Sequence, residues 1–224
     1  MEIKPVAIFH SPVSGKFGLP RQSGVVPQLR GTIEFEPEYR NPDSLRGLDG
    51  FDYIWLIWQF SLNKASDNPT VRPPRLGGNE RVGVFASRSP FRPNPIGLSS
   101  VKVEAIDFRT CTITVSGADL ADGTPIFDIK PYVCYCDIHE GARSGFVDSH
   151  SWDPLKVFYR SNSIRSMAES LLGIENMKAL EGILAEDPRP HYEDNPEKKH
   201  GLMFSGHDIK FRVDGRTVII EEIV

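Results

Sequence analysis

A proline-rich segment between residues 84 and 98 carries the side chains best suited to bind an anion. It holds two guanidinium groups, on Arg88 and Arg92, and both Arg92 and Asn94 precede a proline. Proline fixes its own φ angle and pushes the preceding residue towards extended geometry, so these side chains are presented with little backbone freedom. Donors that are already ordered lose less entropy when a ligand binds. The segment predicts an anion site, and the alternative is a surface loop whose arginines are solvated.

Positive charge gathers in the first half of the chain, although the net charge is -4. Residues 1–105 hold 13 Lys and Arg against 10 Asp and Glu, whereas residues 106–224 hold 13 against 20. Phosphate neutralisation dominates nucleic-acid binding, so the local balance matters more than the total. Between residues 70 and 95, Glu80 is accompanied by five arginines: Arg72, Arg75, Arg81, Arg88 and Arg92. This patch predicts recognition of phosphates or carboxylates, with a solvated charged face as the alternative.

Cysteine and histidine spacing gives no metal or disulfide pattern. Cys134 and Cys136 form a C-x-C in a segment that alternates like a strand, which would place both thiols on one face. No second cysteine pair or closely spaced histidine completes a tetrahedral zinc site, so we expect no metal. The sequence also has no G-x-G-x-x-G, P-loop, G-x-S-x-G or H-E-x-x-H motif. Dinucleotide-binding and hydrolytic sites of those types are therefore not expected.

Up to about residue 138 the chain has the pattern of short strands broken by turn residues. No helical stripe of any length appears, and residues 53–60 are apolar at nearly every position, which predicts a core strand buried on both faces. Segments 11–29 and 63–79 are long loops rich in Gly and Pro, and residues 37–48 could form one short helix. The candidate strands are 5–10, 31–35, 53–60, 81–85, 99–107, 112–116 and 124–135. This spacing predicts a mainly β domain, either an antiparallel barrel or a strongly curved sheet.

After about residue 150 the pattern changes to a small α+β arrangement. Apolar residues three and four apart predict helices at 163–172 and 176–184, separated near Gly173. Strands are predicted at 202–204, 209–213 and 217–220, the last two joined by a hairpin turn at Asp214-Gly215-Arg216. We therefore expect one domain at 1–145 and a second at 150–224. Neither a membrane-spanning stretch nor a signal-peptide pattern is present, so we expect a cytoplasmic protein that does not bind a membrane.

Five segments of residues 1–140 together resemble the TsaA-like family of tRNA N6-adenosine methyltransferases, also known as TrmO. They are Pro20-Arg21-Gln22, Arg30-Gly31-Thr32-Ile33, residues 48–56, residues 81–99 and residues 122–132. Residues 187–190, which read D-P-R-P, are similar to part of the family's smaller appended domain. The resemblance implies a single-sheet β barrel that binds S-adenosylmethionine without a Rossmann domain, usually as a homodimer. It also implies methylation of N6 of threonylcarbamoyladenosine at position 37, in the tRNA anticodon stem-loop.

Matching positions of the family motifs, together with the two residues that follow the core strand, imply a set of cofactor-binding residues. The set is Pro20, Arg21, Gln22, Ser61, Leu62, Arg88, Leu98, Asp122, Gly123, Thr124 and Pro125. The family commonly has a histidine just after the core strand, where this chain has Ser61-Leu62. A backbone contact at that point would survive the change.

The chemistry implied by the resemblance needs alignment, a base and cations. Methyl transfer from a sulfonium is an in-line displacement for which no metal is required. A carbamoylated nitrogen is a poor nucleophile, so removal of its proton should help, and Asp128 is the candidate catalytic base, with Asp122 as the alternative. The threonyl carboxylate and nearby phosphates need donors. The candidate substrate-binding residues are Arg72, Arg75, Arg92 and Asn94. Two alternatives remain: a non-catalytic barrel that binds S-adenosylmethionine or RNA, and a hydrolase or lyase acting on a sulfonium compound.

Overall fold

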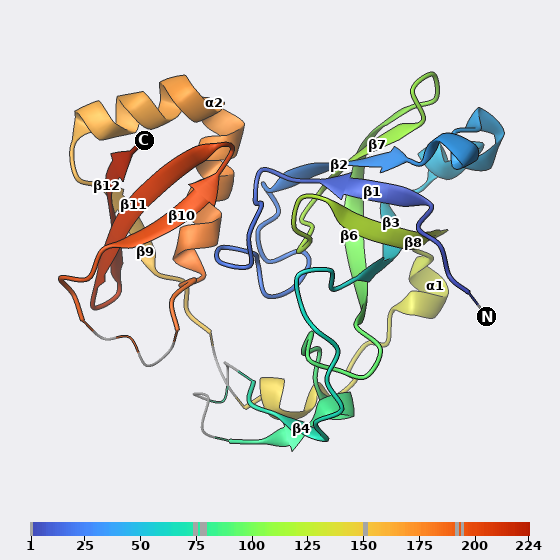
Figure 1. Cartoon of the computed structure of the whole chain (residues 1–224), viewed down its shortest axis with the longest axis horizontal. Helices are drawn as coiled ribbons and strands as arrows, with labels where there is room; N and C mark the ends of the chain where they lie inside the picture. Colours follow the sequence, from blue (N-terminus) through green and yellow to red (C-terminus); the bar gives the residue numbers. More distant parts are fainter. Residues whose placement is uncertain (1, 74–75, 77–79, 150–151, 191–192, 194) are drawn as a thin grey trace.

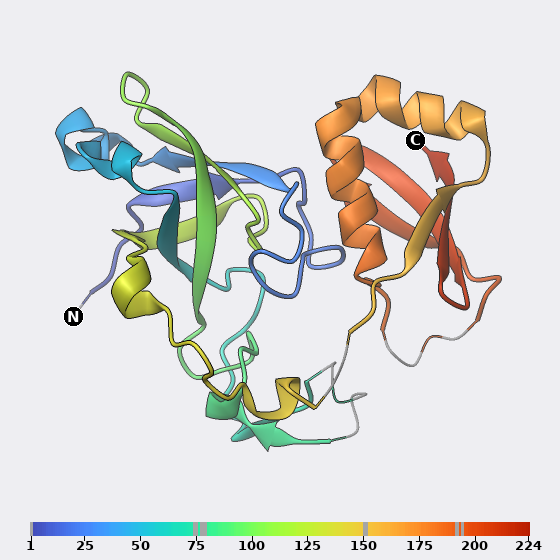
Figure 2. The ribbon, with the colours of Figure 1, turned by 180° about the vertical axis from the view of Figure 1, so that it is seen from behind.

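A closed β barrel and a smaller sheet covered by a helix lie side by side in the molecule (Figure 1). The computed structural model describes residues 2–73, 76, 80–149, 152–190, 193 and 195–224. Arg75, one of the candidate substrate-binding residues, lies outside these described residues. The view from behind shows the same two bodies next to each other (Figure 2).

Six antiparallel strands close the barrel in the order β1-β2-β7-β6-β3-β8. They are β1 (Ala7–His10), β2 (Arg30–Phe35), β3 (Tyr53–Gln59), β6 (Ile96–Asp107), β7 (Thr112–Ser116) and β8 (Thr124–Pro131). Each strand agrees with one of the candidate strands to within a few residues, except that β8 ends earlier. The mainly β architecture, a single-sheet antiparallel barrel with a C-terminal sheet and helix, is therefore confirmed.

The barrel core is built from alternate residues of each strand. On β3, Ile54, Leu56 and Trp58 are buried inside, whereas Trp55 and Ile57 are half-buried. The prediction that this strand is buried on both faces is therefore wrong. Closure of the sheet covers only its inward face, and the outer face is partly covered by neighbouring segments.

One end of the barrel collects its long connections. Three pairs of cross-strand neighbours at strand ends identify this end of the barrel: Phe9 with Thr124, Gln59 with Ile96, and Arg30 with Ser116. We call this the loop end. The first loop (residues 11–29), the arm (residues 60–95) and the segment 117–123 all begin and finish here.

The arm extends away from the barrel and carries its own short ladder (Figure 1). The ladder pairs β4 (Thr70–Val71) with β5 (Val82–Gly83), and a 3-10 turn, η5 (Val84–Ala86), follows at once. The predicted strand at 81–85 is therefore wrong over its second half. Val84 is buried, and its amide still donates to the carbonyl of Pro69, the residue directly before β4, at 2.9 Å, but the chain turns at this point instead of continuing as a strand.

Two further segments differ from the sequence predictions. Residues 37–50 form three 3-10 turns, η1 (Pro37–Tyr39), η2 (Pro42–Leu45) and η3 (Leu48–Gly50), whereas one helix was predicted at 37–48. The predicted strand through residue 135 stops at β8, and Cys134 and Cys136 lie in the one-turn helix α1 (Cys134–Asp137). The cause is Asp137, whose carboxylate accepts hydrogen bonds from the Val133 amide at 2.8 Å and the Trp55 indole at 3.0 Å.

The second body is a four-stranded sheet with one helix. Its elements are β9 (Lys156–Tyr159), α2 (Asn162–Ala185), β10 (His200–Phe204), β11 (His207–Asp214) and β12 (Thr217–Ile223), reached from α1 through the turn η6 (Gly145–Val147). The sheet order is β10-β11-β12-β9, and β9, which the sequence did not predict, pairs parallel with β12. Gly173 interrupts α2 at φ 73°, so the two predicted helices are confirmed. No described helix is long and apolar enough to cross a bilayer.

The first loop of the barrel packs into the core of this second sheet. Val13, Val26 and Leu29 are buried in the same cluster as side chains of α2, β10, β11 and β12. Phe17 stacks on Phe211 with ring centroids 6.2 Å apart. Figure 1 shows the loop between the barrel and α2. The loop therefore belongs to the barrel by sequence and to the second sheet by packing.

Candidate functional site

Two predicted cofactor residues from distant parts of the sequence meet at the loop end. The Arg88 Nη1 donates a hydrogen bond to the amide oxygen of Gln22 at 2.6 Å. Gln22 Nε2 in turn donates to the carbonyl of Arg21 at 2.6 Å, which fixes the orientation of the Gln22 amide. The arm and the first loop are thereby joined through one guanidinium. An exposed cation held beside an amide can bind the carboxylate or hydroxyl groups of a small ligand.

The other two residues of the first loop motif face elsewhere. Pro20 is buried, and the Arg21 guanidinium donates to the main-chain oxygen of Asp187 at 3.1 Å. The same guanidinium lies 4.8 Å from the ring centroid of Trp152. The described contacts of Arg21 thus tie the loop to the second body.

Asp122 and Gly123 form an open turn beside the end of β1. Gly123 has φ 74°, which favours glycine, and its amide donates to the carbonyl of Phe9 at 2.8 Å. The Asp122 carboxylate accepts from the Ser11 amide at 3.1 Å and lies 3.3 Å from His10 Nδ1. β8 begins directly after the turn, and its first two residues are Thr124, which is buried, and Pro125, which is half-buried. The turn is therefore fixed in position at the loop end.

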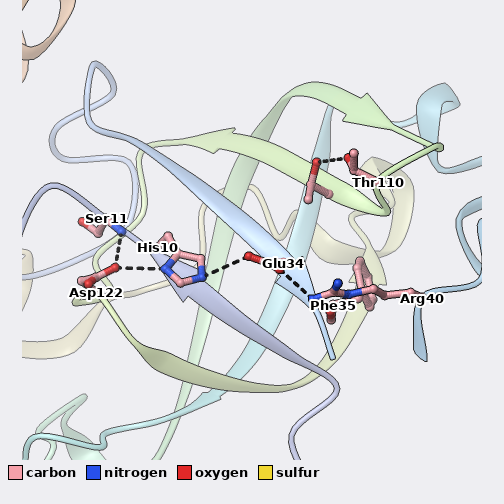
Figure 3. Close-up of polar contacts among 8 residues, drawn as sticks. His10, Ser11, Glu34, Phe35, Arg40, Thr110 and Asp122 are labelled. Atoms are coloured by element: carbon pink, nitrogen blue, oxygen red, sulfur yellow. Dashed lines mark hydrogen bonds and ion pairs between the residues drawn. The ribbon is translucent and has the colours of Figure 1, made fainter. Parts of the chain in front are cut away.

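A polar network continues from this turn along the outer surface of the barrel (Figure 3). His10 Nε2 lies 3.6 Å from Glu34 Oε2, and Arg40 Nη2 donates to Glu34 Oε1 at 2.6 Å. Arg40 Nε also donates to the carbonyl of Phe35 at 2.7 Å. The network links Asp122 through His10 to β2, and it further restrains the turn.

The remaining cofactor candidates are exposed around the same end. Ser61 and Leu62 follow β3, and the Ser61 amide donates to the carbonyl of Gln59 at 2.7 Å. Leu98 lies near the start of β6, opposite Ile57, with 59% of its surface exposed. Exposed leucines beside polar loops offer an apolar surface to a flat ligand group.

The substrate-binding candidates that the structure describes lie on the arm. Arg92 is half-buried, and its Nη1 donates to the carbonyl of Ser87 at 3.3 Å. Asn94 is exposed, and its main-chain oxygen accepts a hydrogen bond from the Ile96 amide at 2.8 Å. Arg72 is exposed just after β4. These side chains share one arm with Arg88.

Asp128 lies on the barrel wall, away from the turns. It is paired with Ile57 in the β3–β8 register, and its carboxylate forms an ion pair with Lys130 at 2.8 Å. It lines a hollow together with Tyr39 and Phe51, and among the described residues around that hollow there is no other candidate site residue. The structure thus brings Asp122, but not Asp128, to the turn where β8 begins.

One carboxylate that was not among the predicted site residues, Asp119, lies in the segment between β7 and β8 at the loop end. The Ser99 hydroxyl donates to Asp119 Oδ1 at 2.6 Å. Burial of the carboxyl group raises the pKa of Asp119, although hydrogen bonds from Ser99 and the Ser23 amide and the charge of Arg88 act to lower it. The available signal was an acidic residue between Ala118 and Leu120 in a short apolar run.

Among the residues that the structure describes, no group of three or more His, Cys, Asp and Glu side chains is arranged to hold a metal ion.

Comparisons with known proteins agree along the whole chain. The tRNA-methyltransferase O N-terminal domain matches residues 8–138, and the TrmO C-terminal domain matches residues 153–224. The tRNA (adenine(37)-N6)-methyltransferase of Escherichia coli (strain K12) is 34% identical over 222 residues, which cover 95% of this chain and 93% of the relative. The putative S-adenosylmethionine-dependent methyltransferase RcsF of Pseudomonas aeruginosa is 37% identical over 212 residues, 92% of this chain and 90% of the relative. A crystal structure of TrmO from Pseudomonas aeruginosa superposes with a TM-score of 0.81 at 28% identity, covering 100% of this chain and 98% of that one.

Proposed function

The chain belongs to the tRNA-methyltransferase O family, and on that premise we infer that it is an S-adenosylmethionine-dependent tRNA (adenine-N6)-methyltransferase. It transfers a methyl group to N6 of adenosine 37 of tRNA. The observation that supports a cofactor site at the loop end is the hydrogen bond between Arg88 and Gln22, because it joins two separate family motifs at one end of the barrel.

The residues at the loop end fit the chemical groups of S-adenosylmethionine. The exposed guanidinium of Arg88 suits the carboxylate of the donor, and the exposed Leu62 and Leu98 suit its adenine ring. No atom lies within 4 Å of the place where a Cβ at Gly123 would stand, so there is open space beside the Asp122 turn. When bound, S-adenosylmethionine supplies an electrophilic methyl group. The protein supplies orientation and charge around it.

We propose that the acceptor adenosine already carries a threonylcarbamoyl group on N6. The support is that two guanidinium groups besides that of Arg88 lie on the arm, those of Arg72 and Arg92. The added group ends in a carboxylate, and arginine binds carboxylates with two parallel hydrogen bonds. Asn94, exposed beside Arg92, offers further hydrogen-bonding groups to the anticodon stem-loop.

The carbamoylated nitrogen must lose a proton during methyl transfer. We propose that an aspartate is the base, and the two candidates are Asp128 and Asp122. Asp122 is favoured by its place in the turn, whereas Asp128 is held by Lys130 on the barrel wall. Substitution of each residue by asparagine shows which of the two carboxylates takes the proton.

We further propose that the enzyme works as a homodimer in the cytoplasm, where its tRNA substrate is available. Support for the dimer comes from large apolar side chains exposed on and beside the arm: Phe85 at 82%, Phe91 at 52% and Leu98 at 59%. Such side chains are rarely exposed together unless a partner covers them.

We propose that the chain has two domains. Residues 1–145 form the methyltransferase domain, and residues 150–224 form the smaller α+β domain. Separate buried clusters support this division. One lies inside the barrel, and the other is formed by α2 and its sheet together with the first loop.

The decisive experiment measures transfer of a labelled methyl group from S-adenosylmethionine to tRNA. tRNA that carries threonylcarbamoyladenosine is compared with the same tRNA lacking it, and the Arg88→Ala variant is run beside the wild type. Label in the modified tRNA alone would support both the reaction and the acceptor. Label in neither, with donor binding demonstrated, would favour the non-catalytic binding barrel. Product analysis would reveal the alternative of a hydrolase or lyase.

A further inference from the structure

A chain of three side chains leads from the barrel core to the loop end. Gly97 lies opposite Trp58, and a Cβ at Gly97 would stand only 2.3 Å from the indole ring. The missing side chain lets Trp58 lie against β6, where its Nε1 donates to the Ser99 hydroxyl at 2.9 Å. Trp58 and Ser99 are both buried.

The direction of each hydrogen bond in this chain is determined by its donors. An indole nitrogen can only donate, so the Ser99 oxygen accepts from Trp58. The single hydroxyl hydrogen of Ser99 is then directed to Asp119 Oδ1 at 2.6 Å. One carboxylate oxygen of Asp119 is thereby fixed by groups that belong to the barrel core.

The other groups that act on Asp119 belong to the proposed cofactor site. The Gly24 amide donates to the carbonyl of Gly117 at 2.7 Å, so the segment that carries Asp119 is bonded to the first loop two residues beyond Gln22. The Arg88 guanidinium exerts its charge on the same carboxyl group and donates to Gln22. The segment that carries Asp119 is therefore held against the first loop, and its carboxyl group lies within range of the charge of Arg88 on the arm.

Placing a carboxyl group here has a cost. Burial disfavours the charged form, and an uncharged side chain of similar size would avoid this penalty. A costly ionisable group within a polar site is a functional candidate when its neighbours are themselves site residues. The alternative is a purely structural hydrogen bond to Ser99, which would not depend on Arg88.

We propose that Asp119 is a positioning residue of the cofactor site: its carboxylate, oriented by Ser99, attracts the Arg88 guanidinium and so keeps Arg88 beside Gln22, where the two side chains bind the donor together. This inference rests on the proposed function of the loop end. Asp119 itself does not contact the donor. Its loss weakens donor binding through Arg88 and leaves the proton-transfer chemistry in place.

The test uses binding of the reaction product S-adenosylhomocysteine, measured by calorimetry on the full chain without tRNA. Asp119→Asn keeps an acceptor for Ser99 but removes the charge that faces Arg88. We expect its dissociation constant to rise about tenfold, which corresponds to about 1.4 kcal/mol of binding free energy, because the attraction that keeps Arg88 beside Gln22 is lost. Asp107→Asn is the matched control, because Asp107 accepts from the Arg109 and Thr110 amides at the opposite end of the barrel. That control should bind like the wild type.

A double-mutant cycle distinguishes positioning from a structural role. In an Arg88→Ala background, Asp119→Asn should cause little further loss of binding, because both changes disrupt the same interaction. Equal losses in the two backgrounds, or an unchanged dissociation constant in Asp119→Asn while Arg88→Ala weakens binding, would overturn the inference and leave the proposed function intact. If wild-type protein bound neither the donor nor S-adenosylhomocysteine, the proposed function and this inference would fail together. Urea unfolding of each variant without ligand checks that the fold is retained.

Discussion

Arg21 donates a hydrogen bond from its guanidinium to the main-chain oxygen of Asp187 at 3.1 Å, and these residues are 166 positions apart. The contact joins the first loop of the barrel to the end of α2. The neighbouring residues of the loop are buried in the core of the second sheet, so the contact is one part of a larger interface. The second body therefore helps to hold the segment that carries Gln22.

The packing of the first loop against β10 can be tested at Gly18. A Cβ at this position would stand 2.2 Å from Leu202 Cδ1, and Leu202 is fully buried. Gly18→Ala should lower the free energy of unfolding by about 1–3 kcal/mol in addition to the strain of its φ angle. Urea unfolding followed by fluorescence measures the loss.

Gly24→Ala is the matched control for that change. Gly24 has a similar φ of 81°, but no atom lies within 4 Å of its Cβ position. The loss in free energy of unfolding for Gly24→Ala should therefore come from backbone strain alone. Equal losses at both glycines would contradict the close packing of the loop against Leu202.

Asp119 should make stability depend on pH in a defined direction. Burial raises the pKa of its carboxyl group above the ordinary value, so the folded state holds this proton more tightly than the unfolded state. The resulting stabilisation is fully present below the unfolded pKa and is lost as the pH rises through the folded pKa. Asp119→Asn does not undergo this loss, so its stability relative to the wild type should increase between pH 4 and pH 8. A difference in urea midpoint that stays constant over this range would contradict the prediction.

The two candidate bases are separated by single substitutions. If Asp128 takes the proton, Asp128→Asn should lower kcat by about 100-fold or more, while Asp122→Asn retains turnover. If Asp122 takes it, the pattern is reversed. Single-turnover rates with modified tRNA at saturating donor measure the chemical step. Full turnover in both variants would show that neither carboxylate is the base.

Arg92 is expected to bind the acceptor rather than the donor. Arg92→Glu should lower kcat/KM for modified tRNA by about tenfold or more, because it places a negative charge beside an anionic ligand. Binding of S-adenosylhomocysteine should stay unchanged. Arg109→Glu, at the turn between β6 and β7, is the control with the same change of charge. Equal effects of the two substitutions would indicate a general electrostatic contribution instead of a specific site.

Much of the barrel could be predicted because strand signals are local. Alternating apolar residues and turn-forming residues identify five of the six barrel strands within a few residues. The predicted end of β8 was wrong because Asp137 accepts a hydrogen bond from Trp55, which is 82 positions away in the sequence. The strand β9 was missed because its four residues are stabilised by parallel pairing with β12.

The candidate site was partly predictable for the same reason. The family motifs identify Gln22 and Arg88, and the structure brings them into contact. The direction of the Arg21 side chain depends on Asp187 in the second body, and the environment of Asp119 depends on Ser99 and the first loop. Such relations between distant residues leave no local pattern in the sequence.

The shared core of the first loop also bears on how the protein is made. A ribosome adds about 5–20 residues per second, so Arg21 is synthesised on the order of ten seconds or more before Asp187. During that interval the six barrel strands can pair, but the loop that carries Gln22 lacks the surface on which it packs. A nascent chain can therefore form its barrel before the first loop reaches its packed position.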